Sequence, residues 1–319
     1  MIKRGIWTIN QLKTGKLKGI WGDDKFVAAD LYIEILNNSE YKDLQELVLM
    51  SMQDQRGAYK RTYEKRFEAF DIAVEAILKP GLSDWQETNI LDVGISDGRT
   101  AVDFYARLKP YLSKNHSYHA TDYSPYIKVI TKGKTRIILD GWDNLIQIIR
   151  PPFVLNTSIS KNILLYPINY AALILLKTFI AKPVIKAYKA NEVEAVELSL
   201  FNIDLQNLAQ DNKNIHLAQY NVLEAVPFDK KFKIVRAMNL FNESYFTDAE
   251  FQTAFNNLKD KIEEGGYFII GSNQDAGSVV NGHVFQKTEN GYKEVYKSGD
   301  GAPITNLQKY LSGSVMVQV

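Results

Sequence analysis

Residues 89–103, NILDVGISDGRTAVD, decide the fold, because an apolar strand runs directly into a glycine-bracketed turn and then a helix. The apolar residues of 90–93 predict a buried parallel strand. Gly94 and Gly98 allow the backbone to turn tightly, and residues 99–108 can begin the following helix. In this order a helix N-terminus and bare backbone face a ligand. The stretch therefore predicts a nucleotide pocket.

A second signal follows about twenty residues later, a spacing that suits an adenosine ligand. Residues 118–121, YHAT, end in Asp122, and Tyr123-Ser124-Pro125 then predicts a turn. A carboxylate at the end of a second strand suits a ribose diol. Doubly wound sheets bind ligands outside the carboxyl ends of their strands, so we expect Gly94 and Asp122 on one lip of the same crevice.

Four ordered stretches resemble the motifs of class I S-adenosylmethionine-dependent methyltransferases. They are LDVGISDGRT at 91–100, TDYSP at 121–125, FKIVRAMNLFNESYF at 232–246 and IEEGGYFIIGSN at 262–273. The resemblance implies an α/β fold with a doubly wound, mostly parallel, seven-stranded Rossmann-like sheet. It also implies a methyltransferase that uses S-adenosylmethionine as its cofactor.

The resemblance also assigns cofactor contacts. In that superfamily the glycine loop passes under the methionine part of the cofactor, and the acid that ends the second strand binds both ribose hydroxyls. Asn221 and Val222, after the third strand, take the place near the adenine, although an Asp is commoner there. The implied cofactor-binding residues are Asp92, Gly94, Ser96, Gly98, Asp122, Tyr123, Asn221, Val222 and Asn239.

The competing interpretation of the glycine loop is a nicotinamide or flavin dinucleotide site, whose pattern is G-x-G-x-x-G. Here Ser96 replaces the middle glycine, which lets a pyrophosphate approach the backbone. Asp97 would repel a phosphate but could pair with an amino group. The loop therefore favours the sulfonium cofactor.

The candidate catalytic residues follow the fourth strand, where the transferred methyl group points in related enzymes. Methyl transfer is a direct displacement, so the protein mainly aligns the acceptor and excludes water. Asn239 and Asn242 could orient a substrate, Glu243 could accept a proton, and Tyr245 is a further polar candidate. The alternative is an ordinary helix-start loop in which Asn242 merely caps.

Composition narrows the function classes. The 319 residues carry a formal net charge of +1, which gives no global reason to expect nucleic acid as a partner. The absence of cysteine rules out disulfides and cysteine-ligated metals, and the four scattered histidines show no metal-ligand spacing. The N-terminus does not resemble a secretion signal, so we expect a cytoplasmic protein.

Residues 1–87 are expected to form a helical N-terminal cap, with helical periodicity over 28–78 that ends at Lys79-Pro80-Gly81. Its Tyr59, Arg61, Tyr63, Lys65 and Arg66 could cover the mouth of the pocket or form a solvated helix face. Residues 88–319 are expected to form the methyltransferase domain. The interval between Asp122 and the third strand is too long for one crossover, so we expect an insertion at 126–195.

The insertion is expected to hold a hairpin over 126–149, closed by Pro151-Pro152, and an apolar helix over 162–181. The apolar stretch approaches the ~20 residues that span a bilayer. Pro167, Asn169 and Lys177 interrupt it, which favours a lid helix on the catalytic core over a transmembrane helix. A helix at the membrane surface stays open, because lysines flank the segment.

These features predict methyl transfer to an oxygen or nitrogen of a small-molecule acceptor. One alternative is a lipid-like or peptide acceptor at a membrane surface, with peripheral contact through 162–181. Another is a catalytically silent module that binds the cofactor and a partner. The sequence leaves the acceptor and the oligomeric state open.

Overall fold

The computed structural model describes residues 3–15, 25–52, 62–157, 167–243, 245–273 and 279–312. The chain forms two compact units: unit 1 contains Met1–Arg61 and Ser124–Leu200, and unit 2 contains Thr62–Tyr123 and Phe201–Val319. The N-terminal segment and the insertion thus share one unit, whereas the sequence predicted a separate cap over 1–87. They are joined because β1 (Lys3–Arg4) pairs antiparallel with β7 (Phe153–Asn156).

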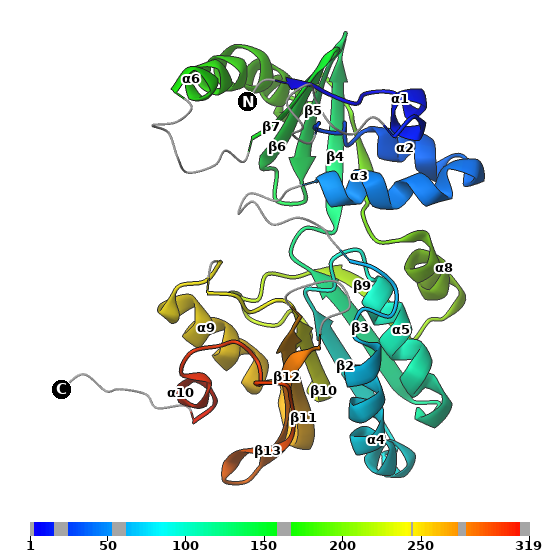
Figure 1. Ribbon diagram of the computed structural model, residues 1–319, viewed down its shortest axis with the longest axis vertical. Helices are drawn as coiled ribbons and strands as arrows, with labels where there is room; N and C mark the ends of the chain where they lie inside the picture. Colours follow the sequence, from blue (N-terminus) through cyan, green and yellow to red (C-terminus); the bar gives the residue numbers. More distant parts are fainter. Residues whose placement is uncertain are drawn as a thin grey trace, which may run out of the picture. The chain divides into compact units, whose positions relative to one another are not determined.

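Unit 1 is built on a six-stranded antiparallel sheet in the order β1-β7-β6-β5-β4-β8 (Figure 1). The remaining strands are β4 (Tyr126–Lys132), β5 (Thr135–Asp140), β6 (Leu145–Arg150) and β8 (Ala195–Ser199). The predicted hairpin is confirmed by β4 and β5. Pro151-Pro152 does not close the sheet, because β7 follows it and pairs with β6.

Helices cover both faces of this sheet, which explains why successive residues of its central strands are apolar, as at 137–139. Successive strand residues point to opposite faces. Ile138 packs with the N-terminal helices, whereas Ile137 and Leu139 pack with the helix of the insertion. The N-terminal helices are α1 (Ile9–Lys13), α2 (Leu31–Leu36), the 3-10 helix η1 (Ser39–Leu44) and α3 (Gln45–Ser51).

The apolar segment of the insertion is helical, as predicted, but its limits differ. It consists of α6 (Pro167–Leu176), a π-helical turn η3 (Lys177–Ala181) and α7 (Lys182–Lys189). Residues 162–166 of the predicted helix lie outside the described residues. Pro167 is the first described helical residue, a position that proline tolerates well. Across the described ranges, every helix is too short or too polar to cross a membrane.

Unit 2 contains a seven-stranded sheet in the order β13-β12-β11-β10-β2-β3-β9. Its parallel strands are β2 (Thr88–Val93), β3 (His116–Asp122), β9 (Ile215–Gln219), β10 (Phe232–Met238) and β11 (Ile262–Ser272). The antiparallel hairpin of β12 (Asn281–Thr288) and β13 (Gly291–Ser298) extends the sheet beyond β11. The third, second, first, fourth and fifth parallel strands lie side by side, which is the doubly wound order. The predicted fold class is confirmed.

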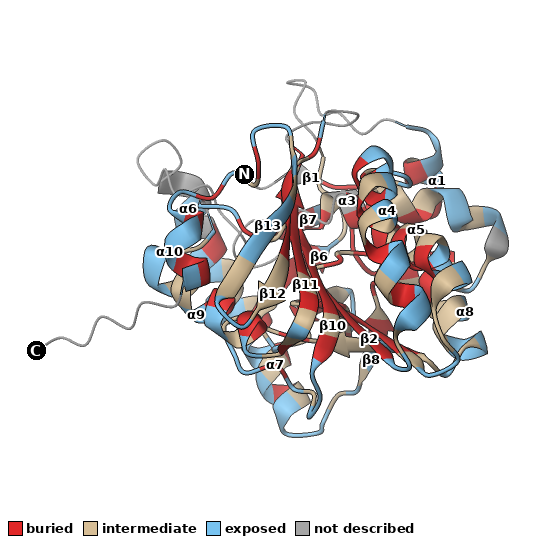
Figure 2. Ribbon diagram, turned by 90° about the horizontal axis from the view of Figure 1, so that it is seen from below, coloured by how far each residue is buried: buried red, intermediate tan, exposed pale blue. Residues whose placement is uncertain are grey.

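Two helix layers enclose this sheet, and Figure 2 shows the buried strands between them. One layer holds α4 (Glu68–Asp84), α5 (Arg99–Leu108) and α8 (Ile203–Asp211). The other holds α9 (Asp248–Lys259) and α10 (Leu307–Ser312). Because β2, β3, β9 and β10 run parallel to one another, their carboxyl ends meet at one edge of the sheet.

The helix end predicted at Lys79-Pro80-Gly81 is wrong. The α4 helix continues through Pro80 to Asp84, because Leu78 and Leu82 on the same side are both buried in the core. Helix α9 ends at Lys259, and Gly265-Gly266 lies inside β11. The pairing of β10 with β11 is irregular there, and a side chain at residue 266 would meet backbone oxygens at 2.9 Å.

Candidate functional site

The turn after β2 is fixed by the next strand and by a neighbouring helix. Gly94, Ser96 and Gly98 all have positive φ angles, of 74°, 61° and 88°. The backbone N–H groups of Gly94 and Ile95 donate to the Thr121 carbonyl over 2.8 and 3.1 Å. A Cβ atom at Gly98 would lie 2.2 Å from a methyl carbon of Leu205. The sequence of the turn is thus dictated by its conformation and by close packing on α8.

Asp122 lies at the end of β3 and contacts this turn. The backbone N–H of Ser96 donates to Oδ2 of Asp122 over 2.8 Å, and the residue is 8% exposed. The backbone N–H of Tyr220 donates to the Asp122 carbonyl over 2.9 Å. The ends of β2, β3 and β9 therefore converge on one residue, Asp122, and Gly94 and Asp122 lie at the same sheet edge, as the sequence predicted.

Two buried polar atoms close to this point have no hydrogen-bond partner among the described residues. They are Oγ of Ser96 and Nε2 of Gln219. Gln219 is the last residue of β9 and lies in register with Asp122. Buried polar groups normally find partners, so these two atoms fit a polar ligand at the strand ends. Gln219 was not among the predicted site residues, and its sequence signal is a polar residue that ends the third parallel strand.

Asn221, Val222 and Tyr123 occupy the turns beside these strand ends. Oδ1 of Asn221 accepts a hydrogen bond from the Leu223 backbone over 3.1 Å, which closes a tight turn after β9. Val222 is buried, and its carbonyl accepts from Asn257 of α9 over 3.0 Å. Tyr123 is half-buried directly after Asp122. The structure thus gathers the predicted adenosine-binding residues at one edge.

Asp97 is engaged within the protein. Its carboxylate pairs with Nε of Arg99 over 3.2 Å and accepts from the Arg99 backbone over 3.1 Å. Its carbonyl accepts from the backbone and side-chain nitrogens of Asn202, over 2.7 and 2.9 Å. These contacts attach the glycine turn to the start of α8.

Asp92 faces the interior of unit 2, which differs from the cofactor contact that the resemblance implied. Its Oδ2 accepts from Nη1 of Arg236 over 3.0 Å and from the Tyr118 hydroxyl over 2.6 Å. Nη2 of Arg236 also donates to both carboxylate oxygens of Asp71, each over 3.3 Å. This buried charge cluster of Asp71, Asp92, Tyr118 and Arg236 ties α4 to three adjacent strands.

Burial sets the ionisation of this cluster. It raises the pKa of Asp71 to about 6 and also raises the pKa of Asp92. Burial alone would lower the pKa of Arg236, but the two carboxylates hold that pKa above its usual value. The guanidinium also lies 4.5 Å from the ring centroid of Phe104. The cation is thus permanent, whereas one of its acids can take up a proton near pH 6.

Asn239 directly follows β10 and holds the carboxyl ends of the fourth and fifth strands together. Its φ angle is 54°, and its side chain exchanges two hydrogen bonds of 3.0 Å with Asn273. Nε of Arg66 donates to Asn273 over 2.9 Å, and Asn273 donates to the Tyr63 hydroxyl over 3.4 Å. Tyr63 and Arg66 thus lie beside Asn239, whereas Tyr59 and Arg61 lie outside the described residues. The role of Asn273, the last residue of IEEGGYFIIGSN, was missed.

The remaining catalytic candidates lie in the loop after β10. Asn242, Glu243 and Tyr245 are exposed, and the Asn242 carbonyl accepts from the Tyr245 backbone over 2.9 Å. Oε1 of Glu243 accepts from the Thr305 backbone over 2.8 Å, and this hydrogen bond lowers the pKa of Glu243. The loop therefore brings the three candidates together, and Thr305 engages the only carboxylate among them.

The strand order, the glycine turn and the acid at the end of β3 occur together in unit 2. Unit 2 therefore has a doubly wound, mostly parallel, seven-stranded Rossmann-like fold. Within the described ranges, no group of three or more histidine, aspartate or glutamate residues could hold a metal ion.

Comparison with known proteins gives structural similarity only. No family model and no curated protein matches the chain. The chain is similar to N-methyltransferase NodS from Bradyrhizobium japonicum WM9, with 12% identity, a TM-score of 0.32, and coverage of 66% of this chain and 70% of that one. For an S-adenosylmethionine-dependent methyltransferase from Clostridium acetobutylicum ATCC 824, the identity is 12%, the TM-score 0.34 and the coverage 78% and 82%.

The glycopeptide N-methyltransferase MtfA, solved with sinefungin, shows 13% identity and a TM-score of 0.31, with coverage of 66% of this chain and half of that one. All three TM-scores are below 0.5. The fold assignment therefore rests on the strand order and on the contacts between strand ends.

Proposed function

We propose that unit 2 binds S-adenosylmethionine at the carboxyl ends of β2, β3, β9 and β10 and transfers its methyl group to an oxygen or nitrogen of a small-molecule acceptor. The observation that carries this proposal is the hydrogen bond from the Ser96 backbone to Asp122. This hydrogen bond joins the glycine turn to an acid of the kind that binds ribose hydroxyls. The two lie at the sheet edge where doubly wound sheets bind nucleotides.

The residues at this edge suit the parts of the cofactor. Asp122, oriented by Ser96, would accept hydrogen bonds from the ribose hydroxyls. The unpartnered Oγ of Ser96 and Nε2 of Gln219 offer further polar contacts. Asn221 and Val222, in the turn after β9, would lie near the adenine. The glycine turn, with its positive φ angles, would let its backbone approach the methionine part closely.

When bound, S-adenosylmethionine supplies a methyl group on a positively charged sulfur. The protein then has to hold the acceptor in line with that group and keep water away. Asn239, fixed by its two hydrogen bonds with Asn273, offers a rigid polar position at the end of β10. Asn242 and Tyr245, in the exposed loop that follows, would contact the acceptor.

Removal of a proton from the acceptor needs a base. Glu243 is the carboxylate that the sequence offers, but it is fully exposed and its hydrogen bond with Thr305 lowers its pKa. A general base works best when its pKa is near the working pH. We therefore propose that alignment, rather than a strong base, is the main contribution of this loop.

Calorimetric titration of the whole protein with S-adenosylmethionine and, separately, with oxidised nicotinamide dinucleotide tests this proposal. Micromolar binding of the sulfonium cofactor alone would support it. Binding of the dinucleotide alone, or of neither compound, would contradict it.

A panel of small amines and hydroxyl compounds, followed by formation of S-adenosylhomocysteine, then tests turnover. Product formation with any member would support the enzyme. Cofactor binding without product from any acceptor class would favour the silent binding module.

A further inference from the structure

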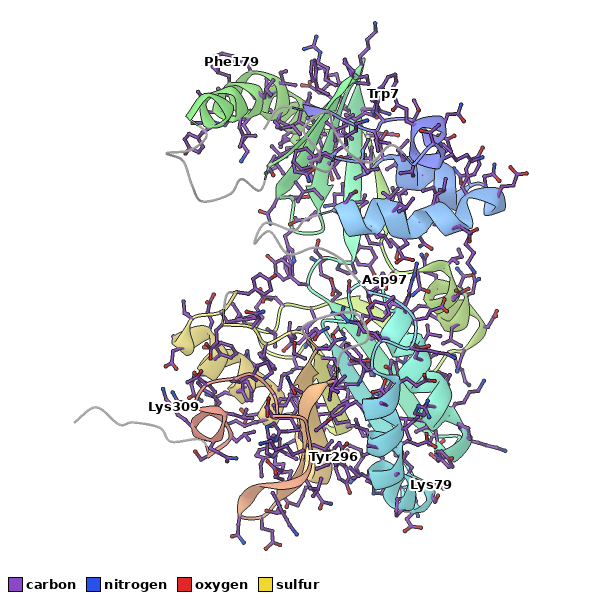
Figure 3. All side chains as sticks on the ribbon, in the orientation of Figure 1. Trp7, Lys79, Asp97, Phe179, Tyr296 and Lys309 are labelled. Atoms are coloured by element: carbon purple, nitrogen blue, oxygen red, sulfur yellow. The ribbon has the colours of Figure 1, made fainter. Side chains whose placement is uncertain are left out.

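The helix of the insertion has an apolar side that its own sheet does not cover. Leu173, Ala181 and Val184 are buried against the sheet of unit 1. The opposite side carries Leu175 and Phe179, which are 55% and 71% exposed, and Figure 3 labels Phe179 on this helix. We define the outer face as Tyr170, Ile174, Leu175 and Phe179, with the lysines Lys182, Lys186 and Lys189 that follow them.

The π-helical turn explains how one side stays exposed along the whole helix. Exposed positions recur at 170, 174, 178, 182 and 186, a spacing of four residues, which is wider than the 3.6 residues of an α-helix. The wide turn at Lys177–Ala181 accommodates the extra residue. Apolar side chains therefore occupy the first half of the outer face, and lysines continue it.

The charge of this region has one sign. Between residues 144 and 191 the chain contains no aspartate or glutamate, but it contains Arg150 and five lysines. Within the outer face, Lys182, Lys186 and Lys189 are exposed. Exposed apolar side chains beside lysines are typical of helices that lie in the surface of an anionic membrane. The long lysine stems let the ammonium groups reach lipid phosphates while the apolar residues enter the acyl boundary.

We propose that the outer face binds the surface of an anionic lipid bilayer, with the helix lying along that surface. This inference is independent of methyl transfer, because every residue in it belongs to unit 1. A second copy of the chain fits the outer face less well, because a two-fold interface is self-complementary and the outer face offers no carboxylate to pair with the lysines of the other copy.

Vesicle sedimentation of the full chain tests this inference, with phosphatidylcholine vesicles compared to vesicles that also contain phosphatidylglycerol. We expect the protein to sediment with the anionic vesicles at low salt and to be released by high salt, because counterions screen the lysines. Vesicles of phosphatidylcholine alone should bind it at least about tenfold more weakly.

Two variants separate the apolar and the basic contributions. Leu175→Ser/Phe179→Ser should abolish sedimentation, and Lys182→Glu/Lys186→Glu should weaken it by about tenfold or more. The side chains are exposed, so the melting temperature should stay unchanged. Matched controls in unit 1 are Val196→Ser, at a residue 52% exposed, and Lys132→Glu/Lys134→Glu, at the turn between β4 and β5.

Three outcomes would overturn the inference. The first is no sedimentation with anionic vesicles, and the second is equal sedimentation of Leu175→Ser/Phe179→Ser and the unaltered protein. The third is a dimer in light scattering that becomes a monomer in this variant without any vesicle binding, which would assign the outer face to a second copy.

Discussion

Arg236 and Asp92 form an ion pair inside unit 2, where Nη1 and Oδ2 lie 3.0 Å apart and each side chain is 1% exposed. The two residues are register partners on the adjacent strands β10 and β2. Asp71 of α4 supplies a second carboxylate to the same guanidinium. Strand β2, which leads into the glycine turn, is therefore tied to β10 and α4 by a buried guanidinium group.

Arg236→Met should lower the free energy of unfolding by about 3–5 kcal/mol, because it leaves two buried carboxylates without their cation. Urea unfolding of the purified protein measures the change. Lys309→Met is the control, since its pair with Asp248 lies on the surface and should contribute less than about 1 kcal/mol. Equal losses in the free energy of unfolding would show that the buried ion pair contributes no more to stability than the surface pair.

Asp71 should make stability depend on pH. Its folded pKa of about 6 lies above the usual 3.8, so the folded state binds more protons in this interval. Its contribution is full below about pH 4 and is lost as the pH rises through about 6, on the order of 1–3 kcal/mol. The charged or titratable groups that act on it are Arg236, Asp92, Tyr118 and Arg107.

Asp71→Asn should remove this slope. Urea unfolding of both proteins between pH 4.5 and 7.5 gives the difference curve, in which unrelated groups cancel. His119 is one such group, because burial lowers its pKa to about 4 and its effect has the opposite sign. A flat difference curve would mean that Asp71 does not titrate in this range.

Asp122→Ala should weaken S-adenosylmethionine binding by about 100-fold or more, because two charge-assisted hydrogen bonds to the ribose, each of about 1.5–3 kcal/mol, would be lost. Calorimetry measures the dissociation constant. The exposed Asp84→Ala is the control and should bind normally. Unchanged affinity in Asp122→Ala would refute the ribose assignment.

Gly98→Ala should reduce both stability and cofactor affinity. The added methyl group meets Leu205 at 2.2 Å, and φ is 88°. Overpacking and backbone strain together should cost about 2–4 kcal/mol. Gly133→Ala isolates the strain, since its φ is also positive but the added atom meets nothing within 4 Å. Similar losses in the two variants would remove Leu205 from the explanation.

Glu243→Gln separates a general base from a loop anchor. Because the side chain is exposed and accepts a hydrogen bond from Thr305, we expect kcat to fall by less than about tenfold and cofactor affinity to stay unchanged. Steady-state kinetics with an identified acceptor provides the measurement. A loss near the upper end of the usual range for acid–base catalysis, about 10²–10⁴-fold, would establish Glu243 as the proton acceptor.

The parallel sheet could be predicted because its strands are local signals. Residues 90–93 are apolar, Gly94 and Gly98 follow, and Asp122 ends the next strand. The partners of Asp92 could not be predicted, since Arg236 lies 144 residues further along the chain. In the motif Asp92 looks like a pocket residue, but the alternation of the strand turns its side chain toward α4.

The organisation of unit 1 was predicted less well than the parallel sheet. The N-terminal segment joins the sheet of unit 1 through Lys3 and Arg4 in β1. These two charged residues show no strand periodicity, so the sequence does not predict this strand. The N-terminal helices were predicted as a cap because helical periodicity shows that a face is buried but does not show against what. Their partner, a sheet that begins at Tyr126, became visible only in three dimensions.

The division of the chain into units also sets an order of events during synthesis. A nascent chain emerges at about 5–20 residues per second, from its N-terminus onward. Unit 1 is complete once Leu200 has emerged, whereas β3, which ends at Asp122, pairs with β9 only after Ile215 has followed. Strands β2 and β3 therefore wait with both outer edges unpaired while the inserted unit folds, because β10 and β9 follow it, and this interval is when we expect a chaperone to bind them.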